Sequence, residues 1–132
     1  MKRRELREHI FKLVFTGHEG FLPEGGVEYY CQDNEITGKD AKLISDKVTL
    51  IFSNLEKIDA LIGENIKGYT FDRISKVSLA VLRLGVYEVV LDEDIPDGVA
   101  ISEAMEIAAK YEDEKSKAFV NGVLGSVARG KQ

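Results

Sequence analysis

Apolar residues recur every three or four positions along most of the chain, which is the spacing of a helix with one buried face. Four stretches show this spacing and are predicted to be amphipathic helices: 4–16, 36–67, 99–111 and 116–127. The longest of them contains a capping-box sequence from Ser53 to Glu56, so we predict two helices that meet near Ser53. Residues 27–31 fit a short helix or a strand, and we predict a short helix.

Residues 72–91 differ, because their apolar side chains surround the helix axis instead of marking one face. A helix that is apolar all round belongs in the middle of a fold. The β-branched residues near its end would also suit a strand, but no alternating partner strand is visible elsewhere in the chain. Three acids at 92–94 and then Pro96 end the helix. The predicted fold class is therefore all-α.

The length of 132 residues predicts a single domain spanning residues 1–132. With 44% hydrophobic and 31% charged residues, the composition is that of an ordinary globular protein. The apolar runs are too short to span a bilayer, and no export signal is readable at the N-terminus. Cys31 is the single cysteine, as is usual in a reducing compartment. We expect a cytoplasmic protein.

The net charge of −5 is unevenly distributed. Residues 1–12 carry five basic and two acidic side chains, and residues 115–132 carry four basic ones and no acid. The stretch between them therefore holds a charge of −12. If the fold brings the two ends together, they form one basic patch that would suit a polyanion. The alternative is that both ends are solvated tails.

Few residues suggest catalysis. His9 and His18 lack the spacing of a helical metal site, Cys31 is read as structural, and no phosphate-binding glycine loop is present. Glu88 is the one acid in an apolar setting, and we expect it to cap a helix end or to pair with an arginine such as Arg83. The prediction is a protein that is not an enzyme and that needs no metal or cofactor.

The start of the last predicted helix fits an anion better. Lys115, Ser116 and Lys117 cluster where free backbone N–H groups and the helix dipole favour a phosphate, and Phe119 follows within a turn. Together with the N-terminal arginines, this set suits single-stranded RNA better than duplex DNA. Two glycines at 122 and 125 in the same helix predict a close helix crossing there.

Four blocks of the sequence resemble the NusB transcription antitermination factors, in the order of that family and over nearly the whole chain. They are residues 3–8 (RRELRE), 81–88 (VLRLGVYE), 95–104 with IP and AISEA, and 119–124 (FVNGVL). The resemblance implies two small helical bundles packed across one another. It also implies binding of the boxA element of nascent RNA together with the small-subunit ribosomal protein NusE. That complex helps RNA polymerase to read through terminators, especially in ribosomal RNA operons.

By position, the resemblance assigns seven residues to RNA binding: Lys2, Arg3, Arg4, Arg7, Lys115, Ser116 and Phe119. It assigns the ribosomal-protein contact to Phe15, Asp72 and Ser78. Ser78 departs from the acid of many relatives, and Ala109 and Gly125 depart from a usual lysine and aspartate.

Partner binding is expected to strengthen RNA binding. The sequence leaves the oligomeric state open, because the helix face that binds the ribosomal protein could pair with itself as a homodimer when that partner is absent. Two alternatives remain open. The chain could be a protein-interaction or self-associating scaffold without RNA binding. The same fold also occurs fused to ribosomal RNA cytosine methyltransferases, but 132 residues leave no room for that catalytic domain.

Overall fold

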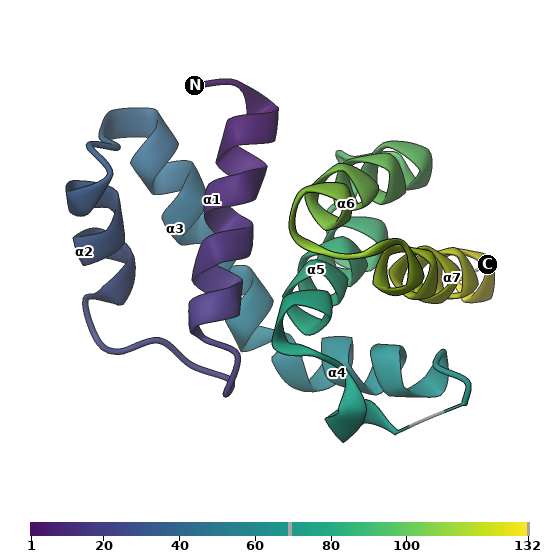
Figure 1. The fold of residues 1–132 in the computed structure, drawn as a ribbon. Coiled ribbons are helices and arrows are strands. Elements are labelled where there is room, and N and C mark those ends of the chain that lie inside the picture. Colours follow the sequence, from purple (N-terminus) through teal and green to yellow (C-terminus); the bar gives the residue numbers. More distant parts are fainter. Residues whose placement is uncertain (69, 132) are drawn as a thin grey trace.

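The computed structural model describes residues 1–68 and 70–131, and every regular element in them is helical (Figure 1). The elements are α1 (Arg3–Thr16), α2 (Gly26–Asp33), α3 (Gly38–Ser53), α4 (Leu55–Glu64), η1 (Phe71–Arg73), α5 (Lys76–Val86), η2 (Tyr87–Leu91), α6 (Asp97–Tyr111) and α7 (Glu114–Gly130). The predicted all-α class is confirmed, as are the short helix at 27–31 and the division of 36–67 into two helices. Within these residues, no helix is both long and apolar enough to cross a membrane.

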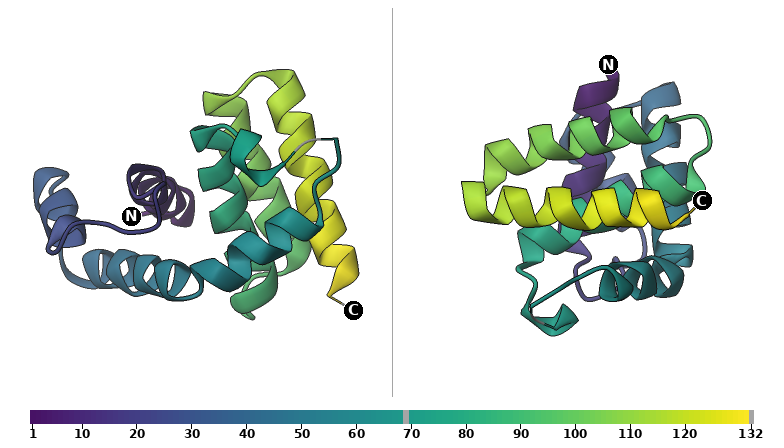
Figure 2. Two further views of the ribbon diagram at one scale, coloured as in Figure 1. Left: turned by 90° about the horizontal axis from the view of Figure 1, so that it is seen from below. Right: turned by 90° about the vertical axis from the view of Figure 1, so that its right-hand side faces the viewer.

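The helices form two groups that meet along α1 and α5 (Figures 1 and 2). Helices α1, α2 and α3 make the first group, and α4 to α7 make the second. Helix α5 is central, because it packs against α1, α4, α6 and α7. This arrangement is the pair of small packed bundles that the resemblance implied.

The central position of α5 follows from its sequence. Every residue from Ser78 to Val89 is buried, which agrees with an apolar pattern on all sides of the helix. The prediction of one helix over 72–91 is wrong at its start, whereas its predicted end is confirmed because helical turns continue to Leu91. Ile74 is extended, and α5 begins after Ser75, whose Oγ accepts a hydrogen bond from the Ser78 N–H at 3.1 Å. At the other end the chain widens into the π-turn η2, where the Asp92 N–H donates to the Tyr87 carbonyl.

The close crossing predicted at Gly122 and Gly125 is also wrong. A Cβ on Gly122 would meet nothing within 4 Å, and one on Gly125 would meet only the Arg129 side chain. The close approach is at Gly85 of α5, where a Cβ would lie 2.9 Å from both Cδ atoms of Leu124. Helix α7 turns its leucine and valines to the core, so its glycines lie on the other side.

The capping box predicted at the α3–α4 junction does not form. Ser53 Oγ donates to the Leu50 carbonyl, and Asn54 occupies the N-cap position of α4 without a side-chain cap bond. The junction itself lies where it was expected. Cys31 is buried in α2, and burial raises the pKa of its thiol, which fits the structural role predicted for it.

Candidate nucleic-acid interface

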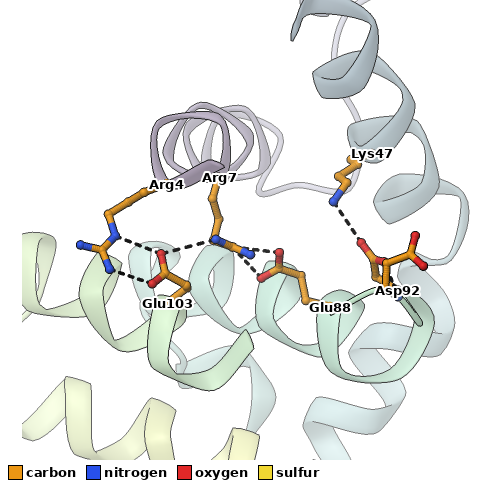
Figure 3. A network of polar contacts seen from close by, with 7 residues as sticks. Arg4, Arg7, Lys47, Glu88, Asp92 and Glu103 are labelled. Atoms are coloured by element: carbon orange, nitrogen blue, oxygen red, sulfur yellow. Dashed lines mark hydrogen bonds and ion pairs between the residues drawn. The ribbon is translucent and has the colours of Figure 1, made fainter. Parts of the chain in front are cut away.

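Two arginines on α1 bind carboxylates of the second bundle (Figure 3). Arg4 forms a two-pronged contact with Glu103 of α6, with Nε to Oε1 at 3.0 Å and Nη2 to Oε2 at 2.8 Å. The Nε of Arg7 lies 3.0 and 2.9 Å from the two carboxylate oxygens of Glu88, and its Nη1 lies 3.4 Å from Glu103. These pairs tie α1 to α5–η2 and α6.

The two arginines differ in their access to solvent. The Arg4 side chain is 65% exposed, whereas that of Arg7 is 10% exposed. The hydrogen bond from Arg4 holds the pKa of Glu103 below its usual value. Burial raises the pKa of Glu88, and Arg7 opposes that rise. Arg4 can therefore reach a phosphate, while Arg7 is part of the junction between the bundles.

Glu88 pairs with an arginine, as expected. The arginine is Arg7, and not Arg83 as the sequence suggested. The guanidinium of Arg83 donates instead to both carboxylate oxygens of Asp59, at 2.9 and 2.8 Å, and to the His18 carbonyl. Both buried arginines thus have structural partners in this fold.

A second group of side chains continues the same face at the end of α6. Lys110 Nζ and the Tyr111 hydroxyl both lie 2.8 Å from Oε2 of Glu8 on α1. The centroid of the Tyr111 ring lies 5.1 Å from that of Phe11, and Tyr111 remains 39% exposed. The sequence analysis missed Lys110 and Tyr111, although a basic and an aromatic residue ending an amphipathic helix were visible.

The start of α7 differs from the free helix end that was expected. Asp113 caps it, since its Oδ1 accepts a hydrogen bond from the Ser116 N–H at 2.8 Å, and this contact lowers the pKa of Asp113. Lys115 is exposed and Ser116 is half-buried. Phe119 is half-buried and packs against the core. The neighbouring Glu112 lies half-buried between α6 and α7 and accepts a hydrogen bond from Ser78 Oγ at 2.8 Å.

The predicted basic ends share one face only in part. Lys2 and Arg3 are exposed at the start of α1, and the Tyr111–Phe11 contact places the α6–α7 junction beside the second half of α1. Helix α7 has 17 residues, so its far end is about 25 Å from Lys115. There Lys131 Nζ binds Asp97 at 2.6 Å and the Val89 carbonyl at 2.7 Å. The basic face therefore leaves out Lys131.

The three residues assigned to a protein partner have different settings. Phe15 is exposed on α1 next to Phe11, and Asp72 is exposed in η1, where it accepts a hydrogen bond from Thr70. Ser78 is buried and reaches the surface only through its bond to Glu112. Direct contact with a partner is thus open to Phe15 and Asp72.

Two helical bundles joined along a central helix, with ion pairs between α1 and α6 across the joint, define an all-helical class of protein. The model of the NusB family matches residues 2–129 of this chain. The transcription antitermination protein NusB of Agathobacter rectalis is 37% identical over 131 residues, which is 97% of this chain and 100% of that protein. This chain therefore belongs to the NusB family.

Solved structures agree with this assignment. The NusB structure from T. maritima superposes with a TM-score of 0.87 and 34% identity, covering 98% of this chain and 92% of that one. NusB in a crystal structure of antitermination factors NusB and NusE in complex with dsRNA gives a TM-score of 0.85 and 27% identity. That match covers 97% of this chain and 96% of the other.

Proposed function

We propose that this protein is a transcription antitermination factor that binds boxA-type single-stranded RNA together with the ribosomal protein NusE. In this role it promotes read-through by RNA polymerase in ribosomal RNA operons, in the cytoplasm, and catalyses no reaction itself. The family membership supports this function, as does the similarity to a NusB that is in a complex with NusE and dsRNA.

One observation carries the proposal: Arg4 of α1 and Lys110 of α6 line one hollow that crosses the joint between the bundles, and we assign the exposed cations near it to the same RNA face. Its basic side chains are Lys2, Arg3, Arg4, Lys110 and Lys115. Cations bind phosphates regardless of base, and the partly exposed ring of Tyr111 offers an aromatic surface on which an unpaired base can stack. In this proposal Arg7 positions α1, and Phe119 and Ser116 contact RNA only at their exposed edges.

A salt titration tests the proposal. A labelled boxA-like RNA and a scrambled control are titrated with the protein, with and without the ribosomal partner. Each phosphate contact adds about −0.7 to the slope of log affinity against log salt, so three or four contacts give roughly −2 to −3. We expect the boxA-like RNA to bind more tightly than the control, and the partner to strengthen it further.

Charge reversal on the face separates RNA binding from a scaffold role. Arg4→Glu should weaken RNA binding, and the loss should shrink in high salt. Lys57→Glu is the matched control, because Lys57 is exposed on α4, outside the face. Equal RNA binding by both variants, or no binding of either RNA by the unchanged protein, would contradict the proposal and favour a scaffold.

The partner arm is tested separately with Phe15→Ala, since Phe15 is exposed beside Phe11. We expect this change to leave RNA binding by the protein alone in place and to reduce the gain from the ribosomal protein. An unchanged gain would remove Phe15 from the partner surface.

A further inference from the structure

A groove of about 630 Å³ separates the two bundles on the side of α1 that faces α3. The buried residues of its lining include Leu6 and Ile10 on α1 and the Arg7–Glu88 ion pair. One wall is α3, and the other is η2 with the loop at 92–96 that follows it. Arg4 and Glu8 line a different hollow with α6, and Arg3 and Arg7 are the only residues assigned to RNA binding that also line the groove.

The α3 wall presents two leucines to solvent. Leu43 is 39% exposed and Leu50 is 46% exposed, and both line the groove. They are seven residues apart, which puts them on one face of the helix two turns from each other. On the other wall Leu91 and Ile95 are half-buried. Partly exposed apolar side chains gathered in one groove mark an interaction site more than scattered single residues do.

The charged side chains that line the groove favour the binding of a positively charged partner. Two ion pairs lie within it: Arg7 with Glu88 at 2.9 Å, and Lys47 with Asp92 at 3.0 Å between the two walls (Figure 3). The remaining charged side chains of the lining are Arg3, Asp46, Glu93 and Asp94. Asp46 also binds Lys42 at 3.0 Å, so the acidic character is strongest on the loop wall. That wall would repel RNA phosphates.

We propose that this groove binds a basic amphipathic helix of a partner protein. The apolar side chains of the partner helix, repeated two turns apart, pack between Leu43 and Leu50 on one wall and Leu91 on the other. The lysines or arginines of the partner helix lie beside the exposed carboxylates of Glu93 and Asp94. The partner enters above the Lys47–Asp92 pair, which stays in place beneath it.

A designed peptide tests the apolar half of the proposal. The probe is a fluorescent helix of leucine and lysine with leucines spaced by three and four, and the control peptide has the same composition in scrambled order. Fluorescence anisotropy with the full chain should show tighter binding of the patterned peptide. Leu50→Glu should weaken it by about tenfold or more, as expected for a central apolar contact.

The matched control is Tyr29→Glu, which makes the same charge change at an exposed residue of α2 outside the groove. It should bind the patterned peptide like the unchanged protein. The helix content and RNA binding of Leu50→Glu should also be unchanged, which shows that this variant still folds.

A second pair of variants tests the charges. The double change Glu93→Gln with Asp94→Asn should weaken peptide binding and make it less sensitive to salt. The control double change, Glu56→Gln with Glu64→Gln, removes two exposed acids of α4 and should leave binding unaltered.

Three results would overturn the proposal. Equal binding of the scrambled peptide would mean that charge alone attracts the probe. Displacement of the peptide by the boxA-like RNA would assign the groove to RNA. Self-association in sedimentation equilibrium that Leu50→Glu abolishes would assign it to a second copy of this chain.

Discussion

Arg4 and Arg7 lie one turn apart on α1 and have the same side chain, yet their surroundings give them different tasks. Arg4 meets Glu103 at the surface, where a phosphate could compete for it. Arg7 meets Glu88 in the interior, where two unpaired charges would be costly. The neighbouring Arg3 is exposed. Variants of these neighbouring arginines can therefore show which side chain stabilises the fold and which binds RNA.

Arg7→Ala should lower the free energy of unfolding by about 3–5 kcal/mol, because it leaves the buried Glu88 carboxylate without its partner. Arg3→Ala should change it by less than about 0.5 kcal/mol, since Arg3 is exposed. Urea unfolding at neutral pH measures both. In folded samples, Arg3→Ala should weaken RNA binding more than Arg7→Ala does. Equal stability of the two variants would contradict the structural role of Arg7.

Glu103→Gln should strengthen RNA binding, because an uncharged side chain holds Arg4 less firmly than the carboxylate does. If Arg4 then adds one phosphate contact, the salt slope becomes steeper by about 0.7. The same titration with Glu64→Gln, a change to an exposed acid of α4, is the control. Weaker binding by Glu103→Gln would mean that Glu103 orients Arg4 for RNA.

The sequence could select these arginines as candidates but could not rank them. Glu88 is 81 residues from Arg7, so no local pattern links the two, and the nearer Arg83 was the natural suggestion. Lys110 and Tyr111 were missed for a similar reason. Their place on the basic face depends on Glu8 and Phe11 of α1, which only the packing of α6 against α1 brings close.

Among the elements, the contact between α5 and α7 depends on one glycine. Gly85→Ala should destabilise the protein by about 1–3 kcal/mol, because the new Cβ would lie 2.9 Å from Leu124 in a filled core. Gly122→Ala is the matched control in α7, where a Cβ meets nothing within 4 Å. This change should stabilise the helix by about 0.5–1 kcal/mol. Thermal and urea unfolding of both variants measure the difference, and a harmless Gly85→Ala would contradict the close crossing.

Periodicity predicted where the helices lie but not how they begin and end. The apolar pattern placed α5 in the centre, because a helix that is buried on all sides has apolar residues on all sides. It could not predict the π-turn at Tyr87–Leu91, since one extra residue in a turn does not change which residues are apolar. Nor could it decide which glycine lies at a crossing, because that depends on the side of α7 that faces α5.

At the scale of the whole molecule, carboxylates connect the two bundles. Glu8 of α1 binds Lys110, and Glu103 of α6 binds Arg4, so each contact crosses from one bundle to the other. The partner cations lower the pKa of both glutamates below the usual 4.5. Glu88 has the opposite shift, because burial raises its pKa. The pH dependence of stability therefore contains terms of both signs.

For a lowered pKa, the stabilisation is present above the unfolded value and is lost as the pH falls through the folded value. For Glu8 and Glu103 this loss begins near 4.5, the usual value for both. For Glu88 the sign reverses, because its stabilisation is present below 4.5 and is lost as the pH rises through its raised folded value. A comparison of variants isolates the two surface glutamates, since Glu88 is common to all of them.

The double variant Glu8→Gln with Glu103→Gln should therefore be less stable than the unchanged protein at about pH 7, and the difference should shrink toward about pH 3. Urea unfolding across this range gives the difference at each pH. The double variant Glu56→Gln with Glu64→Gln, exposed on α4, should show no such trend. A stability difference that stays constant with pH would mean that the two glutamates join the bundles through packing, because a charge contribution must vanish once the carboxylates are protonated.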